Sequence, residues 1–156
     1  MATDTIIISE EVKAMKTIVF DMDGTIANFY GVEGWLDDLE NYRSRPYKVA
    51  KPLVNMSALA RMLNKLKDSG WKVNIISWLS KTGTAEFNAE VTEVKKKWLA
   101  KHLASVEFDN IWIVPYGTPK ENFSGGILFD DEQRNRENWR GQAFDVDNIL
   151  GVLRGL

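Results

Sequence analysis

The sequence predicts a three-layer α/β domain, a Rossmann-like parallel sheet with helices on both faces and a small cap insertion after the first strand. Two observations carry this prediction. Short β-branched apolar runs alternate along the chain with amphipathic stretches of helical period. Each run is also apolar almost throughout, as in strands that are buried on both faces of a parallel sheet. The length of 156 residues suits a single domain.

The chain divides into a short preamble and one domain. Residues 1–15 are interpreted as an N-terminal extension whose native origin is left open, since Met15 would also serve as a start. Residues 16–156 are expected to form the domain. Within it, residues 26–51 have no clean period, which predicts a small cap with one short helix near residues 34–41. Most aromatic and basic side chains of this insertion are interpreted as anchoring it and as offsetting its own acidic residues.

Strands and helices are expected to alternate through the domain. The strands are predicted at residues 17–20, 72–77, 110–115, 126–129 and 143–144. The helices are predicted at residues 53–66, from Thr84 to Leu99, at 132–140 and from Asp147 to Leu153. Pro52 is expected in the first turn of the first helix, and Asp147 is expected to cap the last one. In the helix after Thr84, the apolar face includes Val91 and Trp98, and the side chains expected mostly outside are Lys95, Lys96 and Lys97.

The composition excludes several classes of protein. Without cysteine, the chain has no disulfide framework and no thiol chemistry, and one histidine, His102, excludes metal sites built from several histidines. A net charge of −2 argues against retention on nucleic acid or membrane by bulk charge. With no long apolar run and no signal-peptide layout, a soluble, cytoplasmic domain without a membrane partner is expected. Enzyme chemistry would then rest on carboxylates, lysines and hydroxyls, together with a hard metal.

Polar side chains follow four of the predicted strands, directly or within the next loop. In an open parallel sheet, ligands bind beyond the carboxyl ends of the strands. The residues at these places are Asp21, Asp23, Ser77, Lys120, Asp130 and Asp131. Any one of them has an ordinary structural explanation, as part of a turn, a helix cap or a surface charge. Their combination predicts a Mg²⁺ site, because facing carboxylates repel without a cation, and it leaves Ser77 and Lys120 to hold a phosphate.

The same residues resemble the four motifs of the haloacid dehalogenase-like phosphatase superfamily. The matching positions are DMDGT at residues 21–25, Ser77, Lys120 and the acidic pair at residues 130–131. The resemblance spans residues 16–156. Within that superfamily, the layout of residues 95–103 (KKKWLAKHL) and of residues 113–132 is similar to that of the 5'(3')-deoxyribonucleotidases.

The resemblance implies a Mg²⁺-dependent phosphatase that acts in two steps. Asp21 would be the nucleophile that forms an aspartyl-phosphate, and Asp23 would protonate the leaving oxygen and then activate water. Ser77 and Lys120 would bind the phosphate. Asn135 matches a position that often holds an acid supporting the metal. The metal ligands that the resemblance implies are Asp131 first, with Asp130, Asp21 and Asp23.

Because the cap is small, the site is expected to be open. A (deoxy)nucleoside monophosphate is the best single expectation for the substrate, with Phe29, Tyr30 and Trp78 as candidate contacts. A polynucleotide 3'-phosphatase would use the same site, and nucleic acid is expected only as such a phosphorylated end. A nucleotide-binding protein with little or no turnover is the alternative outside enzymes, although a pure binder has no need of Asp23. A phospho-acceptor receiver domain is disfavoured because the third strand ends in Val114-Pro115 without an acid, and the oligomeric state is left open.

Overall fold

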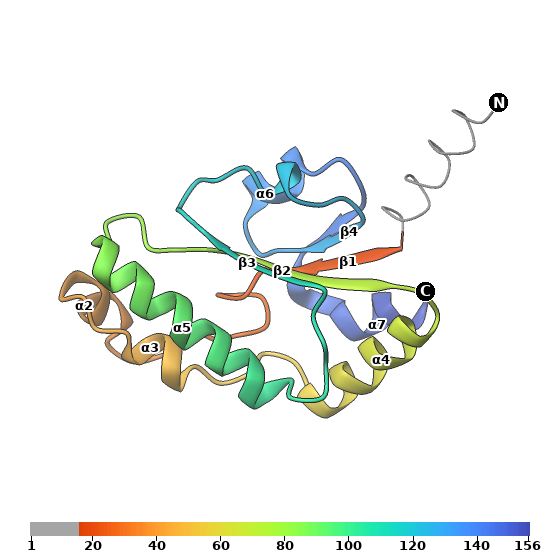
Figure 1. Cartoon of the computed structure of the whole chain (residues 1–156), viewed down its shortest axis with the longest axis horizontal. Helices are drawn as coiled ribbons and strands as arrows, with labels where there is room; N and C mark the ends of the chain where they lie inside the picture. Colours follow the sequence, from red (N-terminus) through yellow and green to blue (C-terminus); the bar gives the residue numbers. More distant parts are fainter. Residues whose placement is uncertain (1–15) are drawn as a thin grey trace.

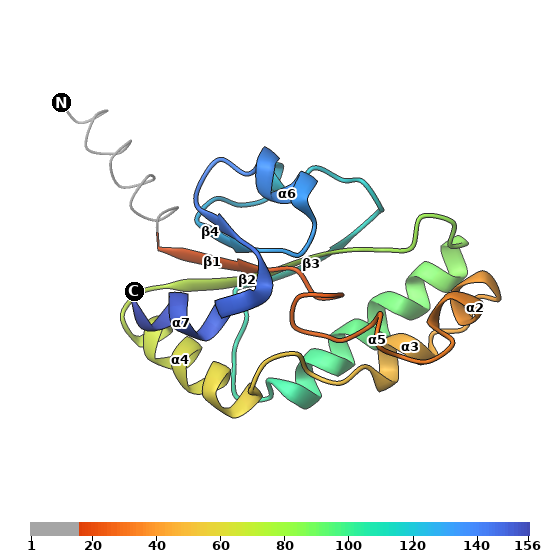
Figure 2. The ribbon, with the colours of Figure 1, turned by 180° about the vertical axis from the view of Figure 1, so that it is seen from behind.

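The structure, a computed structural model, describes residues 16–156, so the extension predicted at residues 1–15 lies outside the described part. Five parallel strands form one sheet with helices on both faces (Figures 1 and 2), which confirms the predicted α/β class. The strand order is β3-β2-β1-β4-β5. The strands are β1 Thr17–Phe20, β2 Lys72–Trp78, β3 Asn110–Val114, β4 Ile127–Phe129 and β5 Ala143–Phe144. None of the helices within residues 16–156 has both the length and the apolar character needed to cross a membrane.

Alternate residues of β1 enter two separate cores, one on each face of the sheet. Ile18 and Phe20 belong to the larger core, and Val19 belongs to the smaller one. Helices α4 (Met56–Asp68), α5 (Ala85–His102) and α7 (Ile149–Arg154) lie on one side of the sheet in Figure 1, and α6 (Gln133–Asn138) lies on the other. Two short 3₁₀ helices complete the elements, η1 Lys120–Asn122 and η2 Val146–Asn148. Burial on both faces explains why the strands read as continuous apolar runs.

The insertion after β1 contains two short helices, α2 (Trp35–Glu40) and α3 (Arg45–Val49), which lie along α5, α2 near its N-terminal end and α3 beside its middle (Figures 1 and 2). The sequence predicts α2 but not α3. Arg43 and Arg45 form ion pairs of 3.0 and 2.6 Å with the buried carboxylate of Asp38. These pairs confirm, for the two arginines, that the basic residues of the insertion offset its acidic ones.

Two predicted helix starts are wrong. Helix α4 begins at Met56, where the Asn55 side chain accepts a hydrogen bond from the Ala58 N–H at 3.0 Å. Pro52 lies before it and forms an isolated bridge with Ala27, so it still belongs to the return from the insertion. At the C-terminal end, Asn148 caps α7, and Asp147 is the residue before it, within η2. In both places an asparagine that bonds the first free N–H groups determines where the helix begins.

Strand order brings two of the predicted acidic positions together. β1 lies between β2 and β4, and Phe20 pairs with Phe129. Asp21 and Asp130 directly follow these paired residues, and the Asp21 N–H donates to the Phe129 carbonyl at 3.0 Å. The two carboxylates therefore stand side by side at the carboxyl edge of the sheet, where ligands of such folds bind.

Candidate active site

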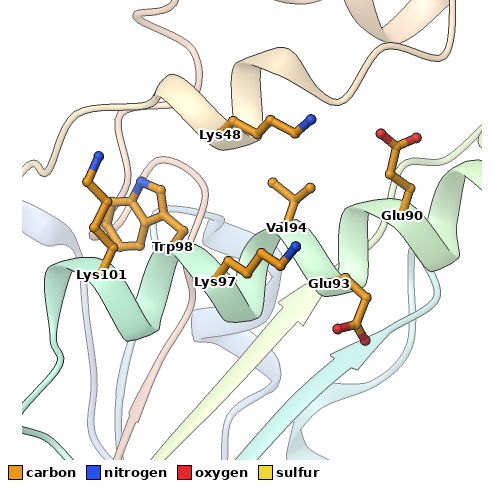
Figure 3. A pocket seen from close by; sticks show the side chains of 7 residues that line it. All are labelled: Lys48, Glu90, Glu93, Val94, Lys97, Trp98 and Lys101. Carbon is orange, nitrogen blue, oxygen red and sulfur yellow. The ribbon is translucent and has the colours of Figure 1, made fainter.

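The predicted site lies in one hollow among residues 16–156, and another hollow lies apart from it. The hollow between α3 and α5 has a volume of about 380 Å³, and three lysines and two glutamates surround its apolar floor (Figure 3). Its lining residues are Lys48, Glu90, Glu93, Val94, Lys97, Trp98 and Lys101. The cleft at the carboxyl edge of the sheet has a volume of about 520 Å³. It is lined by the predicted residues Asp21, Asp23, Phe29, Tyr30, Trp78, Lys120, Asp130, Asp131 and Asn135.

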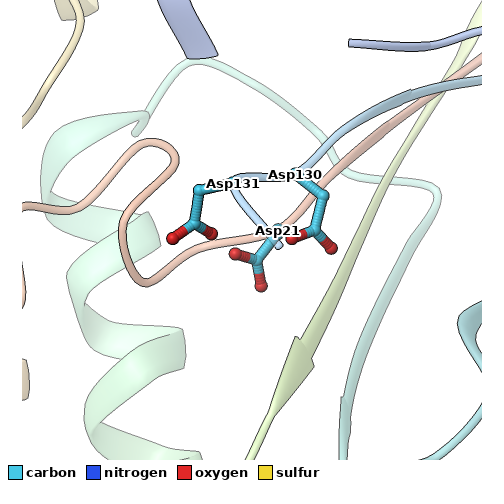
Figure 4. A group of neighbouring side chains, drawn as sticks. All are labelled: Asp21, Asp130 and Asp131. Atoms are coloured by element: carbon cyan, nitrogen blue, oxygen red, sulfur yellow. The ribbon is translucent and has the colours of Figure 1, made fainter. Parts of the chain in front are cut away.

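Three carboxylates converge at the floor of this cleft. Asp21, Asp130 and Asp131 each offer one oxygen, and these oxygens all lie within 4.8 Å of one another (Figure 4). Asp21 and Asp130 are buried. Carboxylate oxygens at such spacing suit a hard divalent cation such as Mg²⁺, which keeps further positions for water and phosphate oxygens. The residues present therefore fit the predicted metal.

Repulsion within this cluster changes its proton affinity. Burial and the neighbouring charge of Asp21 raise the pKa of Asp130 to about 6 and that of Asp131 to about 8. A carboxyl whose pKa is raised by burial and like charge holds its proton unless a cation arrives. The negative charge of the three carboxylates therefore calls for positive charge, of which the chain itself supplies only a part.

Lys120 supplies the nearest positive charge. Its side chain is 1% exposed, and its Nζ lies 2.9 Å from Asp21 Oδ1 and 2.7 Å from Asp130 Oδ2. Burial acts to lower the pKa of Lys120, but the two carboxylates outweigh it and raise the pKa. An ammonium held beside Asp21 is well placed for a phosphate oxygen, although the predicted phosphate contact itself stays a prediction.

Asp130 and Asp131 differ in how much of their bonding capacity the protein uses. Asp130 accepts hydrogen bonds from Lys120 Nζ, from the Glu132 N–H at 2.9 Å and from Asn135 Nδ2 at 3.1 Å. Asn135 thus supports the acidic pair, in agreement with the position that the resemblance assigns to it. Since the Asp130 oxygens are already engaged, Asp131 is the better candidate for direct metal contact.

The loop of the first motif holds Asp131 in place. Thr25 Oγ1 lies 3.0 Å from Asp21 Oδ2 and accepts a hydrogen bond from the Asp131 N–H at 3.2 Å. Gly24 has a φ of +80°, and a Cβ built on it would collide with Asp131 Oδ2. The motif therefore needs glycine at this position for two reasons, the left-handed backbone and the close approach of the carboxylate.

Lys95 is the main correction to the predicted site. The sequence places it mostly outside, yet its side chain is 1% exposed and its Nζ donates to three oxygens. These are Asp23 Oδ2 at 2.9 Å, Ser77 Oγ at 2.7 Å and the Trp78 carbonyl at 2.8 Å. The physical reason is helical geometry, because position 95 lies four residues after Val91 and therefore on the buried face.

Lys95 also determines what Ser77 can do. An ammonium only donates hydrogen bonds, so Ser77 Oγ must be the acceptor in this contact. The hydroxyl proton of Ser77 is then available to another acceptor, such as a phosphate oxygen. Ser77 itself is fully buried, at the end of β2.

Asp23 is held apart from the other carboxylates by its contact with Lys95. Burial raises the pKa of Asp23, Lys95 opposes that rise, and the charge of Asp21 adds to it. A carboxyl with a raised pKa keeps a proton to give, as a general acid requires. The metal-binding role predicted for Asp23 is not tested by this geometry, since the converging oxygens belong to Asp21, Asp130 and Asp131.

The predicted substrate contacts all line the cleft but differ in exposure. Phe29 is buried beneath Tyr30, with the two ring centres 5.2 Å apart, and Tyr30 is 54% exposed. Trp78 is partly buried, and its Nε1–H donates to the Thr118 carbonyl at 2.8 Å. Tyr30 and Trp78 thus present ring surface to the cleft, whereas Phe29 mainly supports Tyr30.

Comparison with known proteins finds similarity in fold. No family model and no curated protein matches the sequence. The solved structure of D,D-heptose 1,7-bisphosphate phosphatase from Burkholderia thailandensis matches with a TM-score of 0.55 and 14% identity, covering 90% of this chain and 97% of that one. The enzyme of that name from B. bronchiseptica, solved with magnesium and phosphate, matches with a TM-score of 0.49 and 14% identity, covering 80% and 74%.

At this identity the first match shows the fold alone. The chain shares its α/β fold with that D,D-heptose 1,7-bisphosphate phosphatase. Neither structure is that of a deoxyribonucleotidase, so the similarity to that group stays a prediction.

Proposed function

We propose that this chain is a Mg²⁺-dependent phosphatase that hydrolyses a phosphate monoester through an aspartyl-phosphate on Asp21. One observation carries the proposal. The Asp21 carboxylate contacts a buried lysine and lies close to two further carboxylates, and a second aspartate two residues away is bound by another buried lysine. A nucleophile, an acid–base group and charge compensation therefore meet at one sheet edge.

The chain's own residues have distinct roles in the proposed reaction. One Asp21 oxygen attacks phosphorus, and the bond between phosphorus and the ester oxygen breaks. Asp23 gives its proton to that leaving oxygen and then takes a proton from the water that hydrolyses the acyl phosphate. Lys120 and the free hydroxyl proton of Ser77 bind the other phosphate oxygens.

The residues that would hold the metal are Asp21, Asp130 and Asp131, and Asp23 stays a prediction in that role. When bound, Mg²⁺ supplies positive charge that lessens the repulsion between a carboxylate nucleophile and a phosphate dianion. Lys120 contributes to the same compensation, since its Nζ lies 2.9 Å from Asp21 Oδ1.

For the substrate, a (deoxy)nucleoside monophosphate is the first candidate. The exposed ring of Tyr30 and the partly buried rings of Trp35 and Trp78 offer surface on which a planar base can stack. A polynucleotide 3'-end is the second candidate, because the two short cap helices leave Tyr30 and Leu36 more than half exposed. A binding protein without turnover is less favoured, since a pure binder has no need of an acid–base group such as Asp23.

Phosphate release from a panel of esters tests the proposed function. The panel contains p-nitrophenyl phosphate, nucleoside 5'- and 3'-monophosphates, a 3'-phosphorylated oligonucleotide and sugar phosphates, each assayed with Mg²⁺ or with EDTA. We expect release that requires Mg²⁺ and is absent from the Asp21→Asn variant, which controls for contaminating phosphatases. Release that survives EDTA, or no release from any ester, would contradict the proposal.

The metal-free protein is expected to lose stability as the pH rises. The folded-state pKa values of Asp130 and Asp131, about 6 and about 8, lie above the ordinary aspartate value of 3.8. At pH values between the ordinary and the raised pKa, the folded state therefore holds more protons than the unfolded state. The free energy of unfolding then falls with rising pH across that window. Mg²⁺ at a hundred times its Kd would restore about 2.7 kcal/mol.

Thermal unfolding in EDTA and in Mg²⁺, across the pH range from 4 to 9, measures this effect. The increase in Tm with Mg²⁺ should grow as the pH rises. The Asp131→Asn variant is the matched control, because it removes one titrating group and should flatten the pH slope in EDTA. If stability falls with pH equally steeply in both proteins in EDTA, ionisation of Asp131 does not destabilise the fold and the prediction is wrong.

A further inference from the structure

Two cations and two aromatic rings form what we call the cationic rim, at the mouth of the cleft. These four residues come from the sheet strands, the loops after them and α6, and none comes from the cap. The cationic rim consists of Trp78 in β2, Lys81 in the loop after it, Tyr116 in the loop after β3, and Arg134 in α6. The rings of Trp78 and Tyr116 lie 5.0 Å apart between centres. Trp78, Lys81 and Tyr116 also line the cleft that contains Asp21.

Two exposed cations converge on these rings from different elements. The Arg134 guanidinium carbon lies 4.9 Å from the centre of the Trp78 ring and 6.0 Å from that of Tyr116. Lys81 Nζ lies 5.9 Å from the centre of the Tyr116 ring. A cation held over an aromatic face keeps its N–H donors available to a ligand, whereas an ion pair would occupy those donors.

Neither cation is neutralised by the chain. Within residues 16–156, no carboxylate forms an ion pair with Lys81 or Arg134. Glu40 and Glu132 line the same cleft, yet they do not pair with either one. Two like charges at one aromatic pair, without a carboxylate between them, favour an anion as the missing partner.

The rim is connected to the reacting centre through one rigid ring. Lys120, which binds Asp21, also lies 5.3 Å from the centre of the Trp78 ring. The hydrogen bond from Trp78 to the Thr118 carbonyl fixes that ring. Lys120 Nζ and the Arg134 guanidinium carbon therefore both lie within 5.3 Å of the centre of the same indole ring.

We propose that the cationic rim binds a second phosphate group, so that a substrate carrying one, such as a nucleoside 3',5'-bisphosphate, is preferred over the corresponding monophosphate. This inference rests on the proposed function. The inner phosphate would meet Asp21 and Lys120, and the outer phosphate would meet Arg134 and Lys81. A planar guanidinium matches two phosphate oxygens at once, and the lysine adds a point charge.

Matched substrate pairs test the rim. Glucose 6-phosphate is compared with glucose 1,6-bisphosphate, and adenosine 5'-monophosphate with adenosine 3',5'-bisphosphate. We expect kcat/KM for the bisphosphate of at least one pair to exceed that for the monophosphate by about tenfold or more, with a preference that weakens as salt increases. Arg134→Gln and Lys81→Gln should each reduce that preference severalfold.

Arg61→Gln is the matched control, since Arg61 is an exposed arginine on α4 that lines neither hollow. The control should retain the full preference. If p-nitrophenyl phosphate is hydrolysed but no bisphosphate is preferred, or if the preference survives both rim variants, the rim proposal is wrong while the proposed function stands.

If no ester is hydrolysed, the proposed function is wrong, and a binding measurement then tests the rim proposal by itself. Calorimetry with the same pairs and wild-type protein would then show tighter binding of the bisphosphate, lost in Arg134→Gln, if the rim binds phosphate. Equal affinity for both members of each pair would overturn the inference.

Discussion

The Asp21→Asn variant is expected to release phosphate at least about a thousandfold more slowly than the wild-type chain, a loss of about 4 kcal/mol of transition-state stabilisation. The amide has nearly the shape of the carboxylate but is not a nucleophile toward phosphorus. Its carbonyl oxygen can still accept from Lys120 Nζ, which bonds Oδ1 in the wild-type structure. The amide nitrogen takes the place of Oδ2 and can donate to Thr25 Oγ1, whose own proton then has Asp131 Oδ1 at 3.3 Å as an acceptor. The change therefore removes the reacting atom and keeps its surroundings.

Stability measurements separate this loss from unfolding. The charge of Asp21 raises the pKa values of Asp130 and Asp131, so a neutral side chain relieves repulsion in the metal-free protein. The Tm of Asp21→Asn in EDTA at neutral pH should equal or exceed that of the wild type. Asp68→Asn, an exposed aspartate on α4, is the matched control and should keep full activity. A variant at position 21 with activity within tenfold of wild type would refute the covalent mechanism.

The meeting of acidic residues at the carboxyl edge of the sheet could be predicted because its signals are local. Each strand is marked by a short apolar run, and the polar residue that ends the run is next to it in sequence. Asp21 after β1 and Asp130 after β4 follow from this rule, and parallel pairing then brings them together. To predict which residues meet at this edge, it is enough to know where the strands end, and the path of the chain between the strands is not needed.

The partners of these residues could not be predicted in this way, because they come from distant parts of the chain. Lys95 lies 72 residues from Asp23 in sequence, and Thr25 lies 106 residues from Asp131. Three consecutive lysines at 95–97 are typical of a solvated helix face. Helical spacing from Val91 to Leu99 nevertheless puts position 95 on the buried face, where a charge without a local partner indicates a site.

The cap shows a second limit of prediction from the sequence. Helix α3 has only five residues and begins with Arg45-Pro46, so it is too short for an apolar period to appear. It is stabilised by tertiary packing instead, since Tyr47 is buried with Phe29 and Phe87 in a cluster between the cap and α5. Short elements that depend on distant aromatic contacts leave little trace in local sequence.

The Lys95→Met variant is expected to lower kcat by about a hundredfold or more, the scale of general acid–base catalysis. Methionine fills a similar volume but donates no hydrogen bond, so Asp23 and Ser77 both lose the group that orients them. Lys95 lowers the pKa of Asp23 by its charge and its hydrogen bond, and that pKa should rise further in the variant. The limb of the pH–rate profile that reports Asp23 should therefore move to higher pH, which a merely structural role would not produce.

Controls distinguish orientation of Asp23 from loss of fold. Lys96→Met changes the neighbouring lysine, which is about half exposed, and should leave kcat and the pH profile unaltered. Lys95→Arg keeps the charge, but its planar fork does not reproduce three donors on one nitrogen, so partial activity is expected. Thermal unfolding monitors stability, because removal of one partner from a buried ion pair can cost about 3–5 kcal/mol.

A double-mutant cycle with Asp23→Asn completes the argument. If Lys95 acts through Asp23, the double variant should be no slower than Asp23→Asn alone, since the group that the lysine orients is already disabled. The double variant should also be more stable than Lys95→Met, because it no longer carries a buried carboxylate without its cation. Independent, multiplicative losses in kcat would instead show that Lys95 acts mainly through Ser77 and the phosphate. That outcome would move its role from proton transfer to phosphate binding, and the unshifted pH profile would report the same change.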